Sequence, residues 1–459
     1  MVEFLSILIG LHTGIHPVQL TVADEVAAVE IRLDGRSLAV LTEPPWAFEC
    51  DFGADPTPHE LVAIGRNGRG EEIDRAARWV NLAASSAAAS LSLERNARGQ
   101  PVAVRISWES IGVRQPRAVE LLFDGEPLEV ANPRRVPLPR FDPGQIHFLS
   151  ATLTFADDRV ERLEASFGGA LGEEVRTELT AVAVVLDKGA KLPAAAQMQG
   201  WFRKNGLSLA VHGVEKGVAE VIFVRDPTVQ PQLEILTNLA LGLDADADRG
   251  GPETTTTAKL RRRLSGRPEL DRLRSLAWLG KDVSLRFLAP AAAPLPGSDL
   301  KPAMFPHSPT YGADDGGFLR ISQQPARLGF PTRYADAVAI AGMAAHSTRR
   351  RRVVVALLGE LPNDRSEVGA ASVRAYLRQL HVPLAVWRFT AGPIHPEWTG
   401  ARDVSVGPRE RKVPERFEEA LADVRRELRR QRIVWLEGRH LPQDIELSPA
   451  ANGIRLAGR

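Results

Sequence analysis

The chain has 459 residues, 44% hydrophobic and 25% charged, a composition typical of a folded protein that is too long for one ordinary core. Lysine and arginine number 58 against 57 acidic residues, so the net charge of +1 gives no electrostatic reason to expect nucleic acid or a charged membrane surface as a partner. The single cysteine excludes an internal disulfide framework and a cysteine-based zinc site.

The apolar stretch 4–11 near the N-terminus is predicted to be a first strand. Glu3 stands where an export signal would carry basic residues, and no small-residue cleavage site follows. No signal peptide is evident, although a start that omits one would look the same. No apolar run approaches the roughly 18 residues that a membrane-spanning helix needs, so no membrane span is predicted.

A repeat organises the first part of the chain. The run 29–35, Val-Glu-Ile-Arg-Leu-Asp-Gly, recurs 90 residues later at 119–125 as Val-Glu-Leu-Leu-Phe-Asp-Gly. Asp34 and Asp124, each followed by glycine, stand between alternating apolar runs. This pattern predicts β-hairpins, because aspartate and glycine tolerate the positive φ that a type I′ turn needs.

The two copies predict two β-sandwich domains, residues 1–82 and 88–178, with the Ala/Ser-rich stretch 83–89 as a linker. His59 and His147 follow the hairpins at equivalent places. The pattern, with Thr-Glu-Pro-Pro-Trp after the first hairpin, resembles bacterial immunoglobulin-like domains. The resemblance implies modules that space or support another domain and carry no catalytic residues.

From about residue 218 apolar strands alternate with helical segments, which is typical of a mostly parallel sheet covered on both faces. The predicted strands are 221–224, 283–288, 353–358, 384–387 and 433–436. The predicted helices are 334–345, 373–380 and 417–428. Because 353–358 is the longest apolar run, it is expected near the centre of the sheet.

The order of these segments resembles a known family. The likeness is carried by Asp226 after the first strand, the helix start 329–337 and the segment 352–360, with a hairpin at 201–207 before them and a helix-strand tail at 413–436 after them. Together they resemble a von Willebrand factor type A-related domain of the Acidobacterial type. The resemblance implies a doubly wound α/β domain over residues 179–459, adhesion-type binding and an extracytoplasmic location.

The family resemblance also implies a metal-ion-dependent adhesion site, which in its intact form has Asp-x-Ser-x-Ser, a loop threonine and a later aspartate. The matching residues here are Asp226, Thr228, Gln230, Thr332 and Glu360. Gln230 offers only a neutral amide oxygen, and Glu360 is one methylene longer than aspartate, so the site is expected to be degenerate. Without a cation, Asp226→Ala should then cost little stability. A Mg²⁺ or Mn²⁺ site at Asp226, Thr228, Thr332 and Glu360 stays an alternative.

Ligands of open α/β sheets bind at the carboxyl ends of the strands. The loops 226–230, 332–334 and 360–364 are therefore expected to form a partner-binding face that includes Tyr334. Trp398, in the Pro-rich loop 393–398, could be exposed and is a further partner-contact candidate, although simple packing within the loop is the favoured interpretation.

Other patterns are weaker. Asp244, Asp246 and Asp248 resemble the start of an EF-hand calcium loop, but Arg249 stands where that loop needs glycine. The arginine clusters 261–263 and 349–352 are expected on the solvated surface.

The sequence thus predicts non-catalytic binding of a protein partner, without a cofactor or nucleic acid. A structural subunit of a larger assembly is the alternative. An enzyme ranks third, because no nucleophile-base pair or intact metal motif is present. No oligomeric state is indicated.

Overall fold

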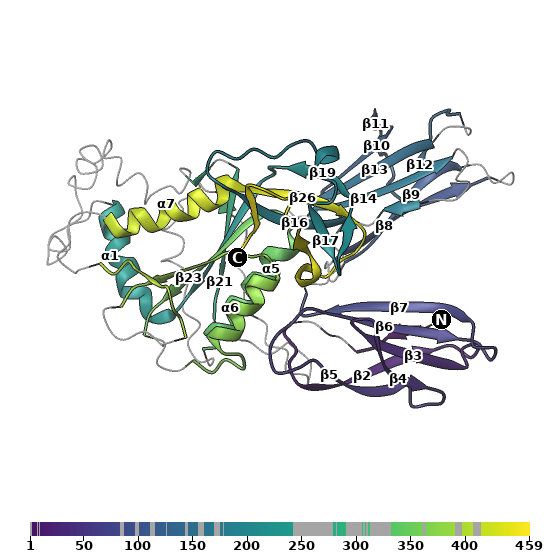
Figure 1. The fold of residues 1–459 in the computed structure, drawn as a ribbon, viewed down its shortest axis with the longest axis horizontal. Helices are drawn as coiled ribbons and strands as arrows, with labels where there is room; N and C mark the ends of the chain where they lie inside the picture. Colours follow the sequence, from purple (N-terminus) through teal and green to yellow (C-terminus); the bar gives the residue numbers. More distant parts are fainter. Residues whose placement is uncertain are drawn as a thin grey trace, which may run out of the picture.

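The chain folds into three β-domains and one α/β domain (Figure 1). The computed structural model describes all residues except 1, 7, 9, 83–86, 97–100, 111–114, 125, 143–145, 155–159, 169–174, 178, 242–278, 281, 291–304, 306–307, 309–310, 313–331, 361–363, 391–396 and 407–414. Among the described helices, none has the length and apolar character needed to cross a membrane.

The first β-domain, module 1, is a two-sheet sandwich with strand orders β1-β2-β5 and β4-β3-β6-β7. Its strands are β1 (Val2–Phe4), β2 (Ile15–Val22), β3 (Ala28–Leu33), β4 (Arg36–Leu41), β5 (Ala47–Asp51), β6 (His59–Arg66) and β7 (Glu72–Val80). Alternate residues face inward, and Val18, Ile31 and Leu61 are fully buried between the sheets. The first strand lies earlier in the chain than the predicted 4–11.

Module 2 repeats this arrangement, with strand orders β12-β9-β8 and β11-β10-β13-β14-β15. Its strands are β8 (Ala87–Arg95), β9 (Pro101–Ser110), β10 (Ala118–Phe123), β11 (Glu126–Leu128), β12 (Val136–Pro137), β13 (Ile146–Thr154), β14 (Val160–Gly168) and β15 (Val175–Thr177). The first seven strands pair in the same order as in module 1, so the sequence repeat corresponds to one immunoglobulin-like sandwich used twice. Residues 87–89, expected in a linker, instead pair with β9 as the start of β8.

Asp34 and Asp124 turn equivalent hairpins, as the repeat predicts. Asp34 connects β3 to β4 and Asp124 lies between β10 and β11, and both have a φ of 50°. Gly125 lies outside the described residues. The carboxylate of each aspartate contacts the histidine that the sequence places at the equivalent position, with 2.7 Å from Oδ2 to Nδ1 of His59 and of His147.

The third β-domain, module 3, is built from two stretches far apart in the sequence. One sheet has the order β19-β26-β16-β28 and the other β18-β17-β27. The strands are β16 (Leu179–Leu186), β17 (Phe202–Lys204), β18 (Leu207–Leu209), β19 (Val211–Glu215), β26 (Gln431–Glu437), β27 (Glu446–Leu447) and β28 (Ile454–Leu456), with short 3-10 helices η2 (Ala195–Met198) and η5 (Pro442–Asp444). Val184, Phe202 and Leu436 share its core. The sequence assigned these stretches to the α/β domain; the structure differs because they pair with each other.

Between β19 and β26 the chain forms the α/β domain around a six-stranded sheet of order β22-β21-β20-β23-β24-β25. Its strands are β20 (Ala219–Arg225), β21 (Val283–Leu288), β22 (Tyr311–Gly312), β23 (Arg351–Leu358), β24 (Leu384–Arg388) and β25 (Arg402–Asp403). Neighbouring strands are parallel except β22, which runs antiparallel to β21. The strand order reverses between β20 and β23, the point where ligands bind in open sheets of this kind.

Helices cover both faces of this sheet (Figure 1). They are α1 (Gln230–Leu241), α5 (Tyr334–Ser347), α6 (Ala370–Gln379) and α7 (Glu415–Arg430), with the short 3-10 helix η3 (Pro227–Val229) before α1. In β23, Val355 and Leu357 pack in one core with α1 and α7, while Val354 and Ala356 pack in the other with α5 and α6. This two-sided burial explains the continuous apolar run, and β23 is one of the two middle strands, as predicted.

The arginines at the start of β23 are buried, which corrects the expectation of a solvated cluster at 349–352. Arg351 is 2% exposed and Arg352 is 0% exposed. The Arg352 guanidinium donates to the carbonyl oxygens that end α5 and α6, those of His346 (3.2 Å), Leu380 (3.3 Å) and His381 (3.4 Å). Helix C-termini leave such carbonyls without helical partners and attract positive charge, so the buried cation joins two helix ends. Burial lowers the pKa of Arg352 to about 10. The cluster 261–263 lies outside the described residues.

Module 1 is docked on the α/β domain and on the C-terminal segment of module 3 (Figure 1). Leu82, at the end of module 1, is 4% exposed and shares the core of α5 and α6. The polar docking contacts are Tyr376 Oη to Asn81 O (2.6 Å), Gln443 Nε2 to Pro58 O (2.7 Å), Ser372 Oγ to the Asp55 carboxylate, and the Arg439 guanidinium 4.2 Å from the Trp79 ring centroid. Module 1 therefore is more than the spacer that the sequence predicted, because it is packed against the helical layer.

Candidate functional site

The candidate site lies at the carboxyl ends of β20 and β23, where the strand order reverses. Asp226 follows β20 directly, and Gly359 and Glu360 follow β23. The parallel register places Arg225 opposite Leu357, so these strand ends are adjacent. The sequence predicted this part of the sheet as the binding face, and the structure does bring Asp226, Thr228 and Glu360 together there.

Asp226 is the centre of a hydrogen-bond network that joins the two strand ends, here named the Asp226 network. Its carboxylate accepts from the Thr228 amide (3.1 Å), the Thr228 hydroxyl (2.7 Å) and the Gly359 amide (3.0 Å). The Thr228 hydroxyl in turn accepts from the Glu360 amide at 2.9 Å. Asp226 is 1% exposed. The carboxylate is thus a hydrogen-bond centre, so, contrary to the expectation from the sequence, its removal is predicted to cost stability.

Gly359 is the residue of the Asp226 network that the sequence analysis missed. A Cβ atom at this position would lie 2.0 Å from Thr228 Oγ1 and 2.6 Å from Asp226 Oδ2. Any side chain would therefore push the two strand ends apart. The signal available in the sequence was a glycine directly after a continuous apolar strand, where a close approach of backbone to polar groups is common.

Gln230 begins α1, and its side chain contacts Arg225 and Glu234. Its Oε1 accepts from Arg225 Nη1 at 2.8 Å, and its Nε2 donates to Glu234 Oε1 at 2.9 Å. The amide oxygen that would replace a metal-binding serine hydroxyl is therefore engaged by a guanidinium. Burial lowers the pKa of Arg225, against the opposing effect of the neighbouring Asp226 charge.

Tyr334 is the first residue of α5 and is fully buried beneath the site. Its hydroxyl lies 3.4 Å from the carbonyl oxygen of Val224, and its amide donates to Asp364 Oδ1 at 2.8 Å. Burial raises the pKa of Tyr334 well above its ordinary value, and the Asp226 and Asp364 carboxylates add to this effect. Tyr334 therefore supports the end of β20 and the loop that contains Asp364 from inside the domain, and it is not available for direct contact with a partner.

A second carboxylate supports the start of α5. Asp336 accepts hydrogen bonds from the Glu367 and Val368 amides at 3.0 and 3.1 Å and from Arg333 Nε at 2.6 Å. Burial raises the pKa of Asp336 and outweighs these contacts, which act in the opposite direction. The loop after β23 is thus fixed to α5 through buried side chains. The sequence gives no comparable signal for Asp336, because two of its three partners, the Glu367 and Val368 amides, lie about thirty residues later.

Thr332 and Glu360 lie at the rim of the site. Thr332 is half-buried, and its carbonyl oxygen accepts from the Arg365 amide at 2.8 Å. Glu360 contributes its amide to the Asp226 network, while its side chain is exposed. Of the described residues predicted to form the face, Thr228, Glu360 and Asp364 are exposed.

Trp398 is 2% exposed, so it is not the exposed partner contact considered from the sequence, and the packing alternative holds. Its ring packs edge-on against Tyr334, with 5.6 Å between ring centroids and an interplanar angle of 74°. The Pro-rich segment before it suggested a projecting loop, but a large apolar ring gains more from burial in the helical core than from solvent contact.

The donor set does not fit a divalent cation. Mg²⁺ and Mn²⁺ need several oxygen ligands with free lone pairs and an open approach. The Asp226 oxygens and the Thr228 hydroxyl are engaged with one another and with two amides, and the Gln230 oxygen faces Arg225. Over the described part of the chain, no group of three or more histidine, cysteine, aspartate or glutamate side chains could hold a metal. The calcium-like run 244–248 lies outside the described residues.

No family model and no curated protein sequence matches the chain. Among solved structures, it is similar to the fibronectin(III)-like modules of Clostridium thermocellum CbhA, with 15% identity and a TM-score of 0.16 over 17% of this chain and 93% of that one. The central fibronectin-III array of RIM-binding protein matches with 9% identity and a TM-score of 0.22 over 45% and 78%.

The human COPII-coat protein Sec24c matches with 10% identity and a TM-score of 0.25, over 49% of this chain and 40% of the Sec24c chain. These scores are too low to transfer a function. The function is therefore argued below from the chain's own residues.

Proposed function

We propose that the chain is a non-catalytic binding protein whose α/β domain recognises a protein partner through the loops at the carboxyl ends of β20 and β23. The observation that carries this proposal is the Asp226 network, which ties the two strand ends together through hydrogen bonds between protein groups. A loop face held by its own hydrogen bonds presents a fixed surface, and preorganisation of this kind lowers the entropic cost of binding.

We further propose that the α/β domain is a von Willebrand factor type A-like domain with a degenerate adhesion site. The strand order supports this assignment: counted along the chain, the strands lie in the order third, second, first, fourth, fifth, sixth, with the third antiparallel. Asp226 and Thr228 keep two of the motif's positions, while Gln230 and Glu360 depart from it. In this proposal binding needs no metal, because the remaining oxygen ligands satisfy one another.

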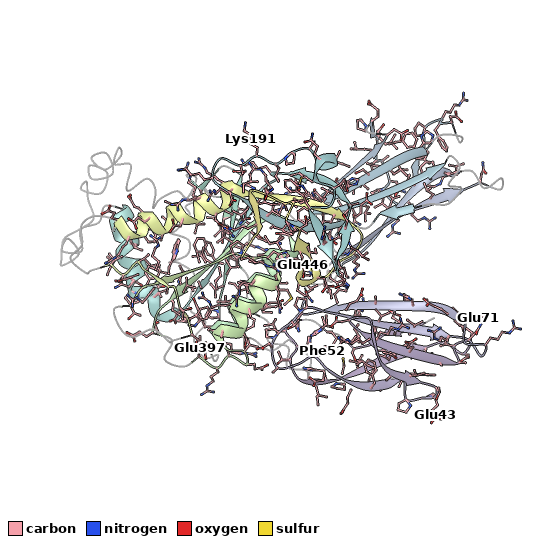
Figure 2. All side chains as sticks on the ribbon, in the orientation of Figure 1. Glu43, Phe52, Glu71, Lys191, Glu397 and Glu446 are labelled. Atoms are coloured by element: carbon pink, nitrogen blue, oxygen red, sulfur yellow. The ribbon has the colours of Figure 1, made fainter. Side chains whose placement is uncertain are left out.

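A test uses one charge reversal on the loop face and one elsewhere. Glu360→Lys changes an exposed side chain of the site, whereas Glu43→Lys changes an exposed side chain in module 1, far from the site (Figure 2). The tagged wild-type protein and both variants are used to capture partners from an extract of the native organism. The captured protein is then purified, and its Kd for each form is measured by titration calorimetry.

We expect the wild-type protein and Glu43→Lys to bind the partner equally, and Glu360→Lys to bind about tenfold more weakly, which corresponds to about 1.4 kcal/mol. Equal binding by all three forms contradicts the loop face as the site. The alternative, a structural subunit, predicts instead a stable stoichiometric assembly with a large interface that covers these loops.

A further inference from the structure

His59 of module 1 faces hydrogen-bond acceptors with both ring nitrogens. Nδ1 lies 2.7 Å from Asp34 Oδ2, and Nε2 lies 3.2 Å from the carbonyl oxygen of Phe52. A neutral imidazole has one donor nitrogen and one acceptor nitrogen, whereas the imidazolium has two donors. Only the protonated ring can satisfy both contacts.

The surroundings favour the charged ring. Burial alone lowers the pKa of His59, but the Asp34 carboxylate and the Phe52 carbonyl outweigh burial and raise it. The other titratable groups nearby are Arg36, whose charge acts on Asp34; His16 and His12, with ring centroids 5.9 and 6.3 Å from that of Phe52; and Cys50, whose thiol pKa burial raises to about 11. The histidine and its aspartate partner are therefore both charged near pH 6.

Phe52 and His59 are the two ends of a loop, residues 53–58, that carries docking contacts of module 1. Within it, Asp55 contacts Ser372 of α6, and the Pro58 carbonyl accepts from Gln443 at 2.7 Å. Figure 2 labels Phe52 at the end of module 1 that faces α6. The His59 ring thus bridges the base of the loop that contacts the α/β domain and module 3.

We propose that protonation of His59 controls the docking of module 1 on the helical layer of the α/β domain. When the ring loses a proton, the remaining one stays on Nδ1, because the carboxylate is the stronger acceptor. The Nε2 lone pair then faces the Phe52 carbonyl oxygen, and this contact is lost. The loop 53–58 then loses one of the contacts at its base, while the hydrogen bonds from the Phe52 amide to the Gly14 carbonyl (2.9 Å) and from Asn81 to the Thr57 carbonyl (2.9 Å) remain, so module 1 is held less firmly.

Whether docking strengthens or weakens with rising pH follows from the direction in which the His59 pKa is shifted. A raised folded-state pKa means that the stabilisation is complete below the ordinary histidine value of 6.5 and is lost as the pH rises through the folded-state pKa. Burial raises the pKa of Asp34, but the hydrogen bonds from His59 and the Glu60 amide outweigh burial and lower it below its ordinary 3.8. The Asp34–His59 ion pair therefore persists in mildly acidic solution. Docking is tight below pH 6.5 and weakens as the pH rises through the folded-state pKa of His59.

Module 2 provides a matched control. His147 has the same geometry, with 2.7 Å from Nδ1 to Asp124 Oδ2 and 2.7 Å from Nε2 to the carbonyl oxygen of Asp142. The docking contacts described above come from module 1 and not from module 2. His147→Gln therefore removes the same type of ion pair without touching the docking loop.

The experiment measures hydrogen-deuterium exchange of α6 (Ala370–Gln379) in the full chain between pH 5.5 and 9, corrected for the intrinsic pH dependence of exchange. We expect α6 protection in the wild-type protein to fall about tenfold over this range, roughly the effect of losing one hydrogen bond from a charged donor. His147→Gln should show the same fall. His59→Gln should show low protection at every pH.

Asp34→Asn provides the second variant, because asparagine tolerates the positive φ of the turn but carries no charge. It should shift the midpoint of the α6 transition to lower pH, and this variant decides the question if His59→Gln does not fold. The proposal is overturned if wild-type α6 protection is independent of pH, if His59→Gln retains the wild-type fall, or if Asp34→Asn leaves the midpoint unchanged.

Discussion

Asp226→Ala tests whether the Asp226 network holds the α/β domain together. The substitution removes the acceptor of three hydrogen bonds and leaves the Gly359 amide, now without its partner, in a buried position. Hydrogen bonds to a charged group contribute about 1.5–3 kcal/mol each, and water entering the space left by the carboxylate recovers part of this. We therefore expect a loss of about 3–5 kcal/mol in metal-free buffer. This matches the cost of about 2–5 kcal/mol for truncating a buried leucine such as Leu357 to alanine.

The measurement is hydrogen exchange of the β20 and β23 amides in buffer containing EDTA. A loss of 3 kcal/mol lowers their protection by roughly 150-fold. Glu360→Ala is the control, because its exposed side chain is removed while its amide stays in the network. A loss below about 1 kcal/mol for Asp226→Ala would refute the reasoning, as would an increase in wild-type protection on adding millimolar Mg²⁺.

Three further outcomes are expected. Gly359→Ala should destabilise the α/β domain by at least about 2 kcal/mol, because the added Cβ atom clashes with Thr228, and urea unfolding measures this. Tyr376→Phe removes one buried hydrogen bond to module 1 and should cost about 1 kcal/mol, seen as faster exchange at the docking surface but not in module 2. His147 should titrate above its ordinary pKa in ¹⁵N-histidine NMR, because Asp124 outweighs the burial that alone would lower it. Module 2 should then lose stability as the pH rises through that value, and a pH-independent unfolding midpoint would contradict this.

Local patterns in the sequence predicted the elements that depend on neighbouring residues. The Asp-Gly hairpins were found because turn chemistry is encoded in two residues, and Asp34 and Asp124 occupy the predicted turns. The apolar run 353–358 predicted a strand buried on both faces, and its residues alternate between the two cores. In each case the physical cause lies within a few residues along the chain.

Features that depend on distant partners were not predicted. Module 3 joins residues on both sides of the α/β domain, with Val182 of β16 paired to Val434 of β26, and no periodicity encodes that pairing. Arg352 was expected on the surface, because the sequence does not show that the C-terminal ends of α5 and α6 accept hydrogen bonds from its guanidinium. Asp226 was correctly located at the strand end, but its role depends on Gly359, 133 residues later.

The way the α/β domain joins module 3 also determines its freedom to move. The chain leaves module 3 after β19 and returns directly into β26, and these strands are hydrogen-bonded neighbours in which Glu215 pairs with Ile433. A domain held by two adjacent attachments can tilt about them, but it cannot spin as it could on a single linker. A partner bound at the loop face would therefore keep a fixed rotational orientation relative to module 3.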